Sequence, residues 1–255
     1  MYIDVFQHHR AISSFPNWVI NDCKNSNPES FKKIVKSVVA DSNVVYSNLD
    51  YFKKYKDSKV LFVAGGPSSK ETEWSTEGYD YIWSCNHFFR HPRLKDLKVD
   101  LAMIMPEVDL QSEEFLQYRQ KHNPYYGFEI HDKWVAHAFD DYERYFCMHT
   151  RFYSKIGIGA RMLIFAGALG CKEVSFIGLD GPIYQIKGNH GFETGKNSFP
   201  SCYHGVSQEV ILKSYLDQHK LLWEHINNFY PNTAYKNLGY GEEQHAFIKN
   251  KGFKE

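Results

Sequence analysis

Short apolar runs alternate with longer amphipathic stretches along most of this chain. From residue 60 onward, the runs are rich in β-branched and aromatic residues, and the stretches between them repeat apolar residues at helical spacing. We predict strands at residues 60–64, 80–85, 99–105, 125–130, 144–148, 173–178 and 233–237. We predict helices at residues 69–76, 112–122, 158–169 and 207–229. This alternation indicates an α/β fold class, in which helices cover both faces of a mostly parallel sheet.

The first part of the chain has a different pattern. After a short strand at its start, residues 28–55 carry apolar side chains at helical spacing and no residues that suggest chemistry. We predict a helical packing element over residues 1–58 and a main domain over residues 59–255. Within that domain, residues 181–206 are rich in Gly, Asn and Pro, and a loop of this length is typical of a lid or a mobile surface excursion.

Composition narrows the class of protein. The 255 residues are 16% aromatic, which disfavours disorder, and 30 Lys and Arg balance 30 Asp and Glu. No net positive field therefore attracts nucleic acid or anionic membranes, and no apolar run is long enough for a membrane span. The start lacks the features of a signal peptide, and the five scattered cysteines suggest reduced thiols, so we expect a cytoplasmic location.

A glycine turn follows the first predicted strand of the main domain. Gly65 and Gly66 permit backbone paths closed to other residues, Pro67 fixes the exit, and Ser68 or Ser69 can cap the next helix. Turns at the carboxyl ends of strands are where open α/β sheets bind nucleotides, as in Rossmann-like domains. An ordinary tight turn explains the same residues equally well.

Two further segments can contact a nucleotide. Asn86 ends the next apolar strand, beside the glycine turn if the two strands are neighbours, and its carboxamide can both donate and accept hydrogen bonds. Gly157, Ile158 and Gly159 open an apolar helix, where free N–H groups favour anions, and Lys155 can neutralise a phosphate or carboxylate. The alternatives are a turn residue for Asn86 and close helix packing for the glycines.

Candidate catalytic groups come from the last third of the chain. Asp180 ends an apolar strand, where it can ligate a metal, hold a sugar hydroxyl or orient a histidine. His190 and His204 are flanked by glycines in the long loop, and histidine suits general acid or base catalysis. Each is equally well explained as a surface histidine, whereas His219 and His225, on the last long helix, are interpreted as structural.

The glycine turn, the Ser-Cys-Asn-His segment and the block from Ile156 to Asp180 together resemble the small bacterial sialyltransferases of glycosyltransferase family 42. The resemblance covers residues 60 to about 237 and implies a single-nucleotide-domain variant of the glycosyltransferase-A-like fold. It also implies a nucleotide-activated sugar donor, no cofactor, no metal and a histidine base, which would be His204. The residues that would contact the donor are Gly65, Gly66, Pro67, Ser68, Asn86, Gly157, Ile158 and Gly159.

The chain departs from that family at several positions. Gly65 stands where the family has asparagine, Gly157-Ile158-Gly159 replaces Thr-Ser-Gly, and Met105 replaces a further asparagine. The donor sugar therefore need not be a sialic acid. The chain also resembles motility accessory factors and MptE-like pterin pyrophosphokinases. These share the Gly-Pro-Ser turn and a Gly-x-Asp strand end followed by a glycine-flanked histidine, here Gly178, Asp180 and His190.

We predict a glycosyltransferase that moves a sugar from a nucleotide-activated donor to an acceptor hydroxyl without a metal. The first alternative is an MptE-like pyrophosphokinase or phosphoryl transferase that needs Mg²⁺, held at Asp180. The second is a glycosyltransferase that acts on a modified DNA base, which a local basic face of Arg90, Arg93, Lys95 and Lys98 would support. A third is a non-catalytic nucleotide-binding module. The partners expected are a donor and an acceptor, and a homo-oligomer is compatible with the sequence.

Overall fold

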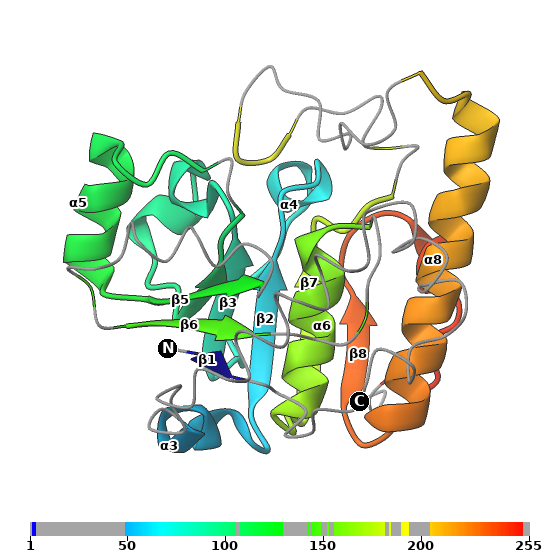
Figure 1. Cartoon of the computed structure of the whole chain (residues 1–255), viewed down its shortest axis with the longest axis horizontal. Helices are drawn as coiled ribbons and strands as arrows, with labels where there is room; N and C mark the ends of the chain where they lie inside the picture. The colour runs from blue at the N-terminus through cyan, green and yellow to red at the C-terminus, as the bar shows by residue number, and fades with distance from the viewer. Residues whose placement is uncertain are drawn as a thin grey trace.

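The computed structural model describes residues 2–3, 49–105, 108–129, 142, 144–148, 152, 156–181, 184, 190–193 and 205–251. These residues form one eight-stranded sheet in the order β1-β6-β5-β4-β3-β2-β7-β8, with every neighbouring pair parallel (Figure 1). The α/β Rossmann-like fold predicted from the sequence is confirmed.

Each predicted strand is present within two residues of its predicted ends. The strands are β1 (Tyr2–Ile3), β2 (Lys59–Val63), β3 (Tyr81–Cys85), β4 (Leu101–Met103), β5 (Tyr125–Glu129), β6 (Tyr145–Met148), β7 (Glu173–Ile177) and β8 (Ala234–Asn237). Residues 60–63 of β2 are completely buried, as expected for a central strand between two parallel neighbours.

The helices of the described residues follow the prediction less evenly. They are α3 (Leu49–Phe52), α4 (Ser68–Glu71), α5 (Glu113–His122), α6 (Ile158–Ala168), α8 (Gln208–Phe229) and α9 (Glu242–His245). Three short 3₁₀ helices are η2 (Lys53–Tyr55), η3 (Phe88–Arg90) and η4 (Leu94–Asp96). The three long helices match the sequence prediction to within one residue. Most of the predicted N-terminal packing element, residues 1–58, lies outside the described residues.

The predicted helix 69–76 was too long, because α4 ends at Glu71 and Thr72 is already extended. The side chains that follow α4 explain this early end. The Thr72 hydroxyl donates to the Ser68 carbonyl at 2.6 Å, and the Trp74 indole N–H donates to the Ser69 carbonyl at 2.7 Å. The Ser68 carbonyl thus accepts both the N–H and the hydroxyl of Thr72, and the Trp74 indole takes the Ser69 carbonyl, which would otherwise accept the next helical hydrogen bond.

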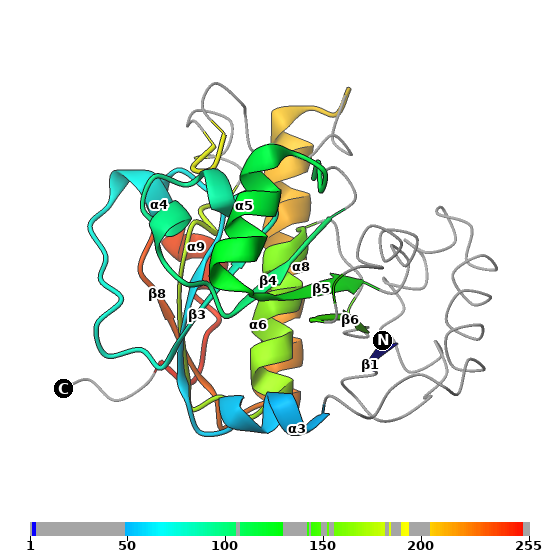
Figure 2. The same cartoon turned by 90° about the vertical axis from the view of Figure 1, so that its left-hand side faces the viewer.

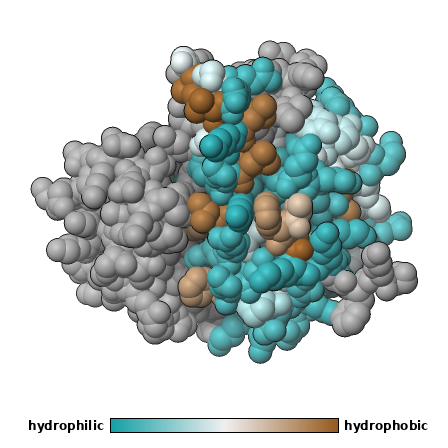
Figure 3. All heavy atoms as spheres, turned by 90° about the vertical axis from the view of Figure 1, so that its right-hand side faces the viewer, coloured by the Kyte–Doolittle hydropathy of each residue, from teal (hydrophilic) through white to brown (hydrophobic). Residues whose placement is uncertain are grey.

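The two longest helices after β6 are buried to different extents, with α8 buried along one side and α6 buried all round. α8 buries Ile211, Tyr215, Leu222, Trp223 and Ile226, and it contacts α6, which is buried over residues 158–167. Its outer side is mainly hydrophilic, with a few apolar residues among the polar ones (Figure 3). Among the described helices, none is both long and apolar enough to cross a membrane.

The order of the strands reverses beside β2. The chain passes from β2 to β3 in one direction along the sheet and from β7 to β8 in the other, although β2 and β7 are neighbours. Right-handed crossovers then place α4 and α8 on opposite faces of the sheet. A crevice opens at such a switch point, outside the carboxyl ends of the strands, and ligands of doubly wound sheets bind there. In Figure 2, α4 lies at the upper end of the sheet and α6 and α8 lie to one side of it.

Candidate functional site

The turn after β2 and the loop after β7 are locked together at the switch point. Ala64 donates to the carbonyl of Ile177 and Gly66 donates to that of Gly178, both at 2.8 Å. A Cβ atom on Gly66 would lie 2.5 Å from both the Asp180 carboxylate and the Gly178 carbonyl. Glycine is therefore required at residue 66 because the second loop approaches it so closely.

Asp180 is the centre of this lock. Its side chain is completely buried, and its Oδ2 accepts a 2.7 Å hydrogen bond from the N–H of Ser68. Its Oδ1 accepts hydrogen bonds from the Ser68 hydroxyl and, at 3.2 Å, from the N–H of Tyr240. The Ser68 hydroxyl oxygen in turn accepts a 3.0 Å bond from the N–H of Gly178.

These bonds correct the prediction that a serine caps α4. No side chain at the N-cap position, Pro67, bonds to the helix, and the Ser69 hydroxyl donates to the Gly66 carbonyl instead. The N–H of Ser68 is satisfied by Asp180, which lies 112 residues away in the sequence. A carboxylate at this place also complements the partial positive charge of the first turn.

Burial raises the pKa of the Asp180 carboxyl group, and the hydrogen bonds from Ser68 and Tyr240 oppose that rise. Both carboxylate oxygens are already used by donors of the protein. The geometry therefore assigns Asp180 to shaping the glycine turn.

His190 packs directly on the glycine turn. A Cβ atom on Gly65 would lie 2.6 Å from Cε1 and 2.7 Å from Nε2 of the His190 ring. Gly191 donates to the carbonyl of Gly65 at 2.9 Å, and Phe192 donates to Nδ1 of His190 at 3.1 Å. Because Nδ1 accepts this bond, the proton of a neutral His190 ring lies on Nε2, on the side facing Gly65. The structure thus brings the predicted histidine to the predicted turn.

Asn86 lies at the same edge of the sheet. Val63 pairs with Ser84 across β2 and β3, so continuing this register places Asn86 next to Gly65, as expected. The residue has a positive φ of 50°, which asparagine tolerates, and its Oδ1 accepts a 3.0 Å bond from the N–H of Met105. Half of the carboxamide therefore holds the end of β4. Its Nδ2 group has no acceptor among the described residues.

The two glycines at the start of α6 have different surroundings. Gly157 has a φ of 82°, and a Cβ atom there would meet nothing within 4 Å. A Cβ atom on Gly159, by contrast, would collide with the side chain of Leu179, next to Asp180. Gly159 thus serves close packing, whereas Gly157 leaves open space beside the uncapped start of α6. Ile158 is buried.

Glu193 was not predicted from the sequence. It links the segment that contains His190 to η3. Its carboxylate lies 3.3 Å from Nδ1 of His87 and 3.4 Å from Nη1 of Arg90. The position of His87 directly after Asn86 was the available signal, but nothing in the sequence paired it with residue 193. Tyr240 was missed as well, because it contributes its backbone N–H to Asp180.

The remaining predicted residues give a mixed result. Lys155 and His204 lie outside the described residues, so their roles stay predictions.

Two members of the suggested basic face have partners inside the protein. Arg90 pairs with Glu114 and Glu193, and Arg93 bonds to the Trp74 carbonyl and lies 3.6 Å over its ring. In the described part of the chain, no three His, Cys, Asp or Glu side chains form a cluster that could hold a metal.

No protein-family model matches this chain, and no curated protein matches it either. The family resemblances based on the glycine turn and the Ile156–Asp180 block therefore stay predictions. The assignment of function rests on the residues of the switch point and their geometry.

Proposed function

We propose that the protein is a nucleotide-sugar-dependent glycosyltransferase with its donor site at the β2–β7 switch point. The observation that carries this proposal is the packing of His190 on Gly65, in the crevice where open α/β sheets bind nucleotides. A histidine held against a glycine turn pairs an imidazole donor with a backbone that a phosphate can approach closely.

The groups around the crevice have complementary roles in this proposal. The Nε2–H of His190 donates to a phosphate oxygen of the donor, and the open start of α6 at Gly157 directs its positive dipole end toward the same charge. Asn86 donates from Nδ2 to the nucleotide, while its Oδ1 stays bonded to Met105. Asp180 keeps the turn in shape through Ser68 and touches no substrate.

The proposed reaction is an inverting displacement at the anomeric carbon. The acceptor oxygen forms the new bond as the bond from the anomeric carbon to the phosphate oxygen breaks, and the electron pair leaves with the phosphate. His204 takes the proton of the acceptor hydroxyl, and His190 stabilises the charge on the departing phosphate.

The two enzymatic alternatives receive less support from the geometry. A magnesium site at Asp180 would have to displace hydrogen bonds from Ser68 and Tyr240 to both carboxylate oxygens. A DNA-binding face would have to release Arg90 and Arg93 from their contacts with Glu114, Glu193 and Trp74. Activity lost on adding EDTA would favour the first alternative, and salt-sensitive DNA binding would favour the second.

Nucleotide binding is the first test. Thermal unfolding is measured with CMP, UDP, GDP and their sugars, with and without Mg²⁺; a ligand at about 100 times its Kd adds about 2.7 kcal/mol of stability. Replacing His190 with Ala should weaken the best ligand by about 10- to 100-fold, the value of a hydrogen bond to a charged group. Gly65→Ala should act in the same direction because its Cβ displaces the His190 ring. The exposed Ser75→Ala variant is the control, and equal affinity in all three variants would refute the site.

The base is tested separately by turnover. His204→Ala should bind the donor normally and release free nucleotide on addition of acceptor about 100- to 10,000-fold more slowly. Unchanged turnover would remove His204 from the mechanism while leaving the nucleotide site intact.

A further inference from the structure

Two tyrosine rings stack on each other beside the glycine turn. Tyr184, in the loop after β7, lies over Tyr240, in the loop after β8, with ring centroids 4.9 Å apart and an angle of 27° between the rings. The pair is close to the turn because Asp180 accepts hydrogen bonds from the N–H of Tyr240 and from the N–H of Ser68. The rings therefore lie at the carboxyl edge of the sheet, on the β8 side of the switch point.

The Tyr240 ring is held in place from several directions. Its backbone N–H donates to Oδ1 of Asp180 at 3.2 Å, and its carbonyl accepts a 3.0 Å bond from Nδ2 of Asn237. Its hydroxyl donates to Oε2 of Glu71, on α4, at 3.4 Å. A ring fixed in this way needs no rearrangement before it supports a second ring, which lowers the cost of binding a ligand there.

The Tyr184 ring has an open face. Tyr184 is 39% exposed although Tyr240 covers one side of its ring, so the exposed area belongs to the other face and to the edge. In the described part of the chain, no hydrogen bond or ion pair involves the Tyr184 hydroxyl. A flat ring placed on the free face would bury apolar area without displacing any such bond.

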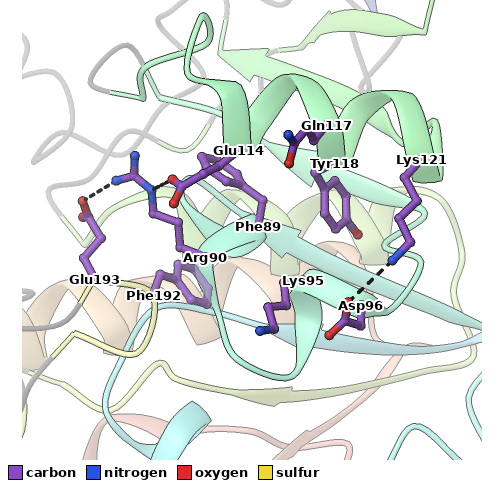
Figure 4. A pocket seen from close by; sticks show the side chains of 10 residues that line it. All are labelled: Phe89, Arg90, Lys95, Asp96, Glu114, Gln117, Tyr118, Lys121, Phe192 and Glu193. Atoms are coloured by element: carbon purple, nitrogen blue, oxygen red, sulfur yellow. Dashed lines mark hydrogen bonds and ion pairs between the residues drawn. The ribbon is translucent and has the colours of Figure 1, made fainter.

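The β3 side of the switch point has a different lining. A cavity of about 710 Å³ lies there, between η3, η4, α5 and residues 192–193 (Figure 4). It adjoins the glycine turn through Phe192, whose ring centroid lies 5.4 Å from that of His190. The aromatic residues among its described lining are buried, since Phe89 is 5% exposed and Tyr118 and Phe192 are each 4% exposed. Of these two sides, the β8 side is therefore the one that presents an exposed aromatic face.

We propose that the nucleobase of the donor stacks on the free face of Tyr184. The proposal rests on the nucleotide site of the proposed function and adds the position of the base. The phosphates lie at the glycine turn, the base lies on the stacked tyrosines, and Asn86, on the β3 side, is left to the sugar-phosphate part of the donor. Stacking uses the flat face that every base has, and it contributes about 5- to 150-fold in affinity per base.

A sugar ring fits the same face less well. Its hydroxyl groups would need hydrogen-bond partners around the ring. The two carboxylates that contact Tyr240, those of Glu71 and Asp180, already accept hydrogen bonds from the protein. A stacked sugar would have to share them, whereas the face of a base carries no hydrogen-bonding group.

The test compares nucleotides with a ligand that lacks the base. The probes are AMP, GMP, CMP and UMP, with ribose 5-phosphate as the matched ligand, and Kd is measured by calorimetry and by ligand-observed NMR. We expect the best nucleotide to bind about 5- to 150-fold more tightly than ribose 5-phosphate. Saturation transferred from the protein should be stronger on the protons of the base than on those of the ribose, which a purely structural role of Tyr184 would not produce.

Substitutions of Tyr184 separate the aromatic ring from the size of the side chain. Tyr184→Leu should weaken the best nucleotide by about 5- to 150-fold and leave the affinity for ribose 5-phosphate unchanged. Tyr184→Phe keeps the ring and should restore most of the lost affinity. Phe229→Leu is the matched control, because Phe229 is a 63% exposed aromatic residue at the C-terminal end of α8.

Three results would overturn the proposal. The first is that ribose 5-phosphate binds as tightly as every nucleotide, and the second is that Tyr184→Leu and Phe229→Leu lose equal affinity. The third is that Tyr184→Leu weakens the binding of methyl glucoside and leaves nucleotide binding unchanged, which would assign the stack to a sugar.

Failure of the proposed function gives a different result. His190 contacts the phosphate in that proposal, so His190→Ala should weaken nucleotides and ribose 5-phosphate alike. Nucleotide binding that depends on Tyr184, without transfer of a sugar to any acceptor, would reject the glycosyltransferase function and leave the stacking intact. An effect of His190→Ala without an effect of Tyr184→Leu would reject the stacking alone.

Discussion

The carboxylates at the upper edge of the sheet serve two different purposes. Asp180 is completely buried and accepts hydrogen bonds from Ser68 and Tyr240 on both oxygens. Glu114, which lines the cavity beside η3, has a side chain that is 62% exposed and shares Arg90 with a second carboxylate. The same chemical group is thus buried in the scaffold at one place and exposed to solvent at the other. Burial and the number of internal donors distinguish the two roles.

This difference determines which groups of the protein are available to bind a nucleotide in the proposed site. At the switch point the polar side chains that look catalytic in the sequence are used to shape the turn. In the proposed site, a nucleotide would contact backbone amides, the start of α6 and the His190 ring. At the cavity beside η3, by contrast, charged side chains such as Glu114 form part of the lining.

The largest expected effect on stability comes from breaking the hydrogen bonds between the turn after β2 and the loop after β7. Asp180→Ala leaves the buried hydroxyl and N–H of Ser68 without an acceptor and removes the acceptor of the half-buried Tyr240 N–H. Each such group costs about 1–3 kcal/mol, so the free energy of unfolding should fall by about 3–5 kcal/mol. Urea denaturation measures this value.

Two variants sharpen the first comparison. Asp180→Asn keeps one acceptor oxygen and should lose less stability than the alanine variant. Glu114→Gln breaks only an exposed ion pair and should change the free energy of unfolding by less than about 1 kcal/mol. Similar losses for Asp180→Ala and Glu114→Gln would show that the two carboxylates are not different in role.

A smaller effect on stability distinguishes the roles of Gly157 and Gly159 at the start of α6. Gly159→Ala forces a methyl group against Leu179 and should cost about 1–3 kcal/mol through overpacking. Gly157→Ala meets open space, and its cost is the strain of a backbone conformation (φ 82°, ψ −168°) that is nearly restricted to glycine, about 1–3 kcal/mol. In a double variant, Leu179→Ala should recover part of the loss from Gly159→Ala, whereas it should simply add to that from Gly157→Ala. Additive losses in both pairs would contradict the packing role of Gly159.

The last effect is a dependence of stability on pH, which comes from buried histidines behind the loop that follows β7. Burial lowers the pKa of His245 to about 4 and that of His219 to about 3, and Nε2 of His245 lies 2.9 Å from the Leu179 carbonyl. Below the unfolded pKa of about 6.5, the unfolded chain binds protons that the folded protein does not. Stability should therefore fall with falling pH, by about 1.4 kcal/mol per pH unit for each histidine.

Urea denaturation between about pH 7 and pH 5 measures this slope. His245→Gln should reduce this slope by the contribution of one histidine, about 1.4 kcal/mol per pH unit. His91 and His225, whose pKa values burial also lowers, should maintain the rest. A slope unchanged by His245→Gln would mean that this histidine takes up a proton without disturbing the loop.

The strands were predictable from sequence because central parallel strands are continuous apolar runs, as in Val60–Ala64. The end of α4 was not, since it depends on Trp74 and Thr72 folding back on helix carbonyls. The glycine turn, Asn86 and His190 were found as separate candidates by local chemistry and by resemblance. Their contacts could not be found in this way, because the bond from Ser68 to Asp180 and the pairing of Glu193 with Arg90 join distant parts of the chain.

The link between Ser68 and Asp180 also bears on the order in which the molecule assembles. The turn after β2 receives its hydrogen bonds from the loop after β7 only when β7, which follows six earlier strands in the chain, pairs with β2. Contacts between residues so far apart in sequence form slowly, because closing the long intervening loop is costly in entropy. A nascent chain that ends before β7 therefore carries the Gly-Gly-Pro-Ser sequence without the hydrogen bonds to Gly178 and Asp180 that fix the turn. The proposed nucleotide site therefore exists only in a chain whose sheet is complete.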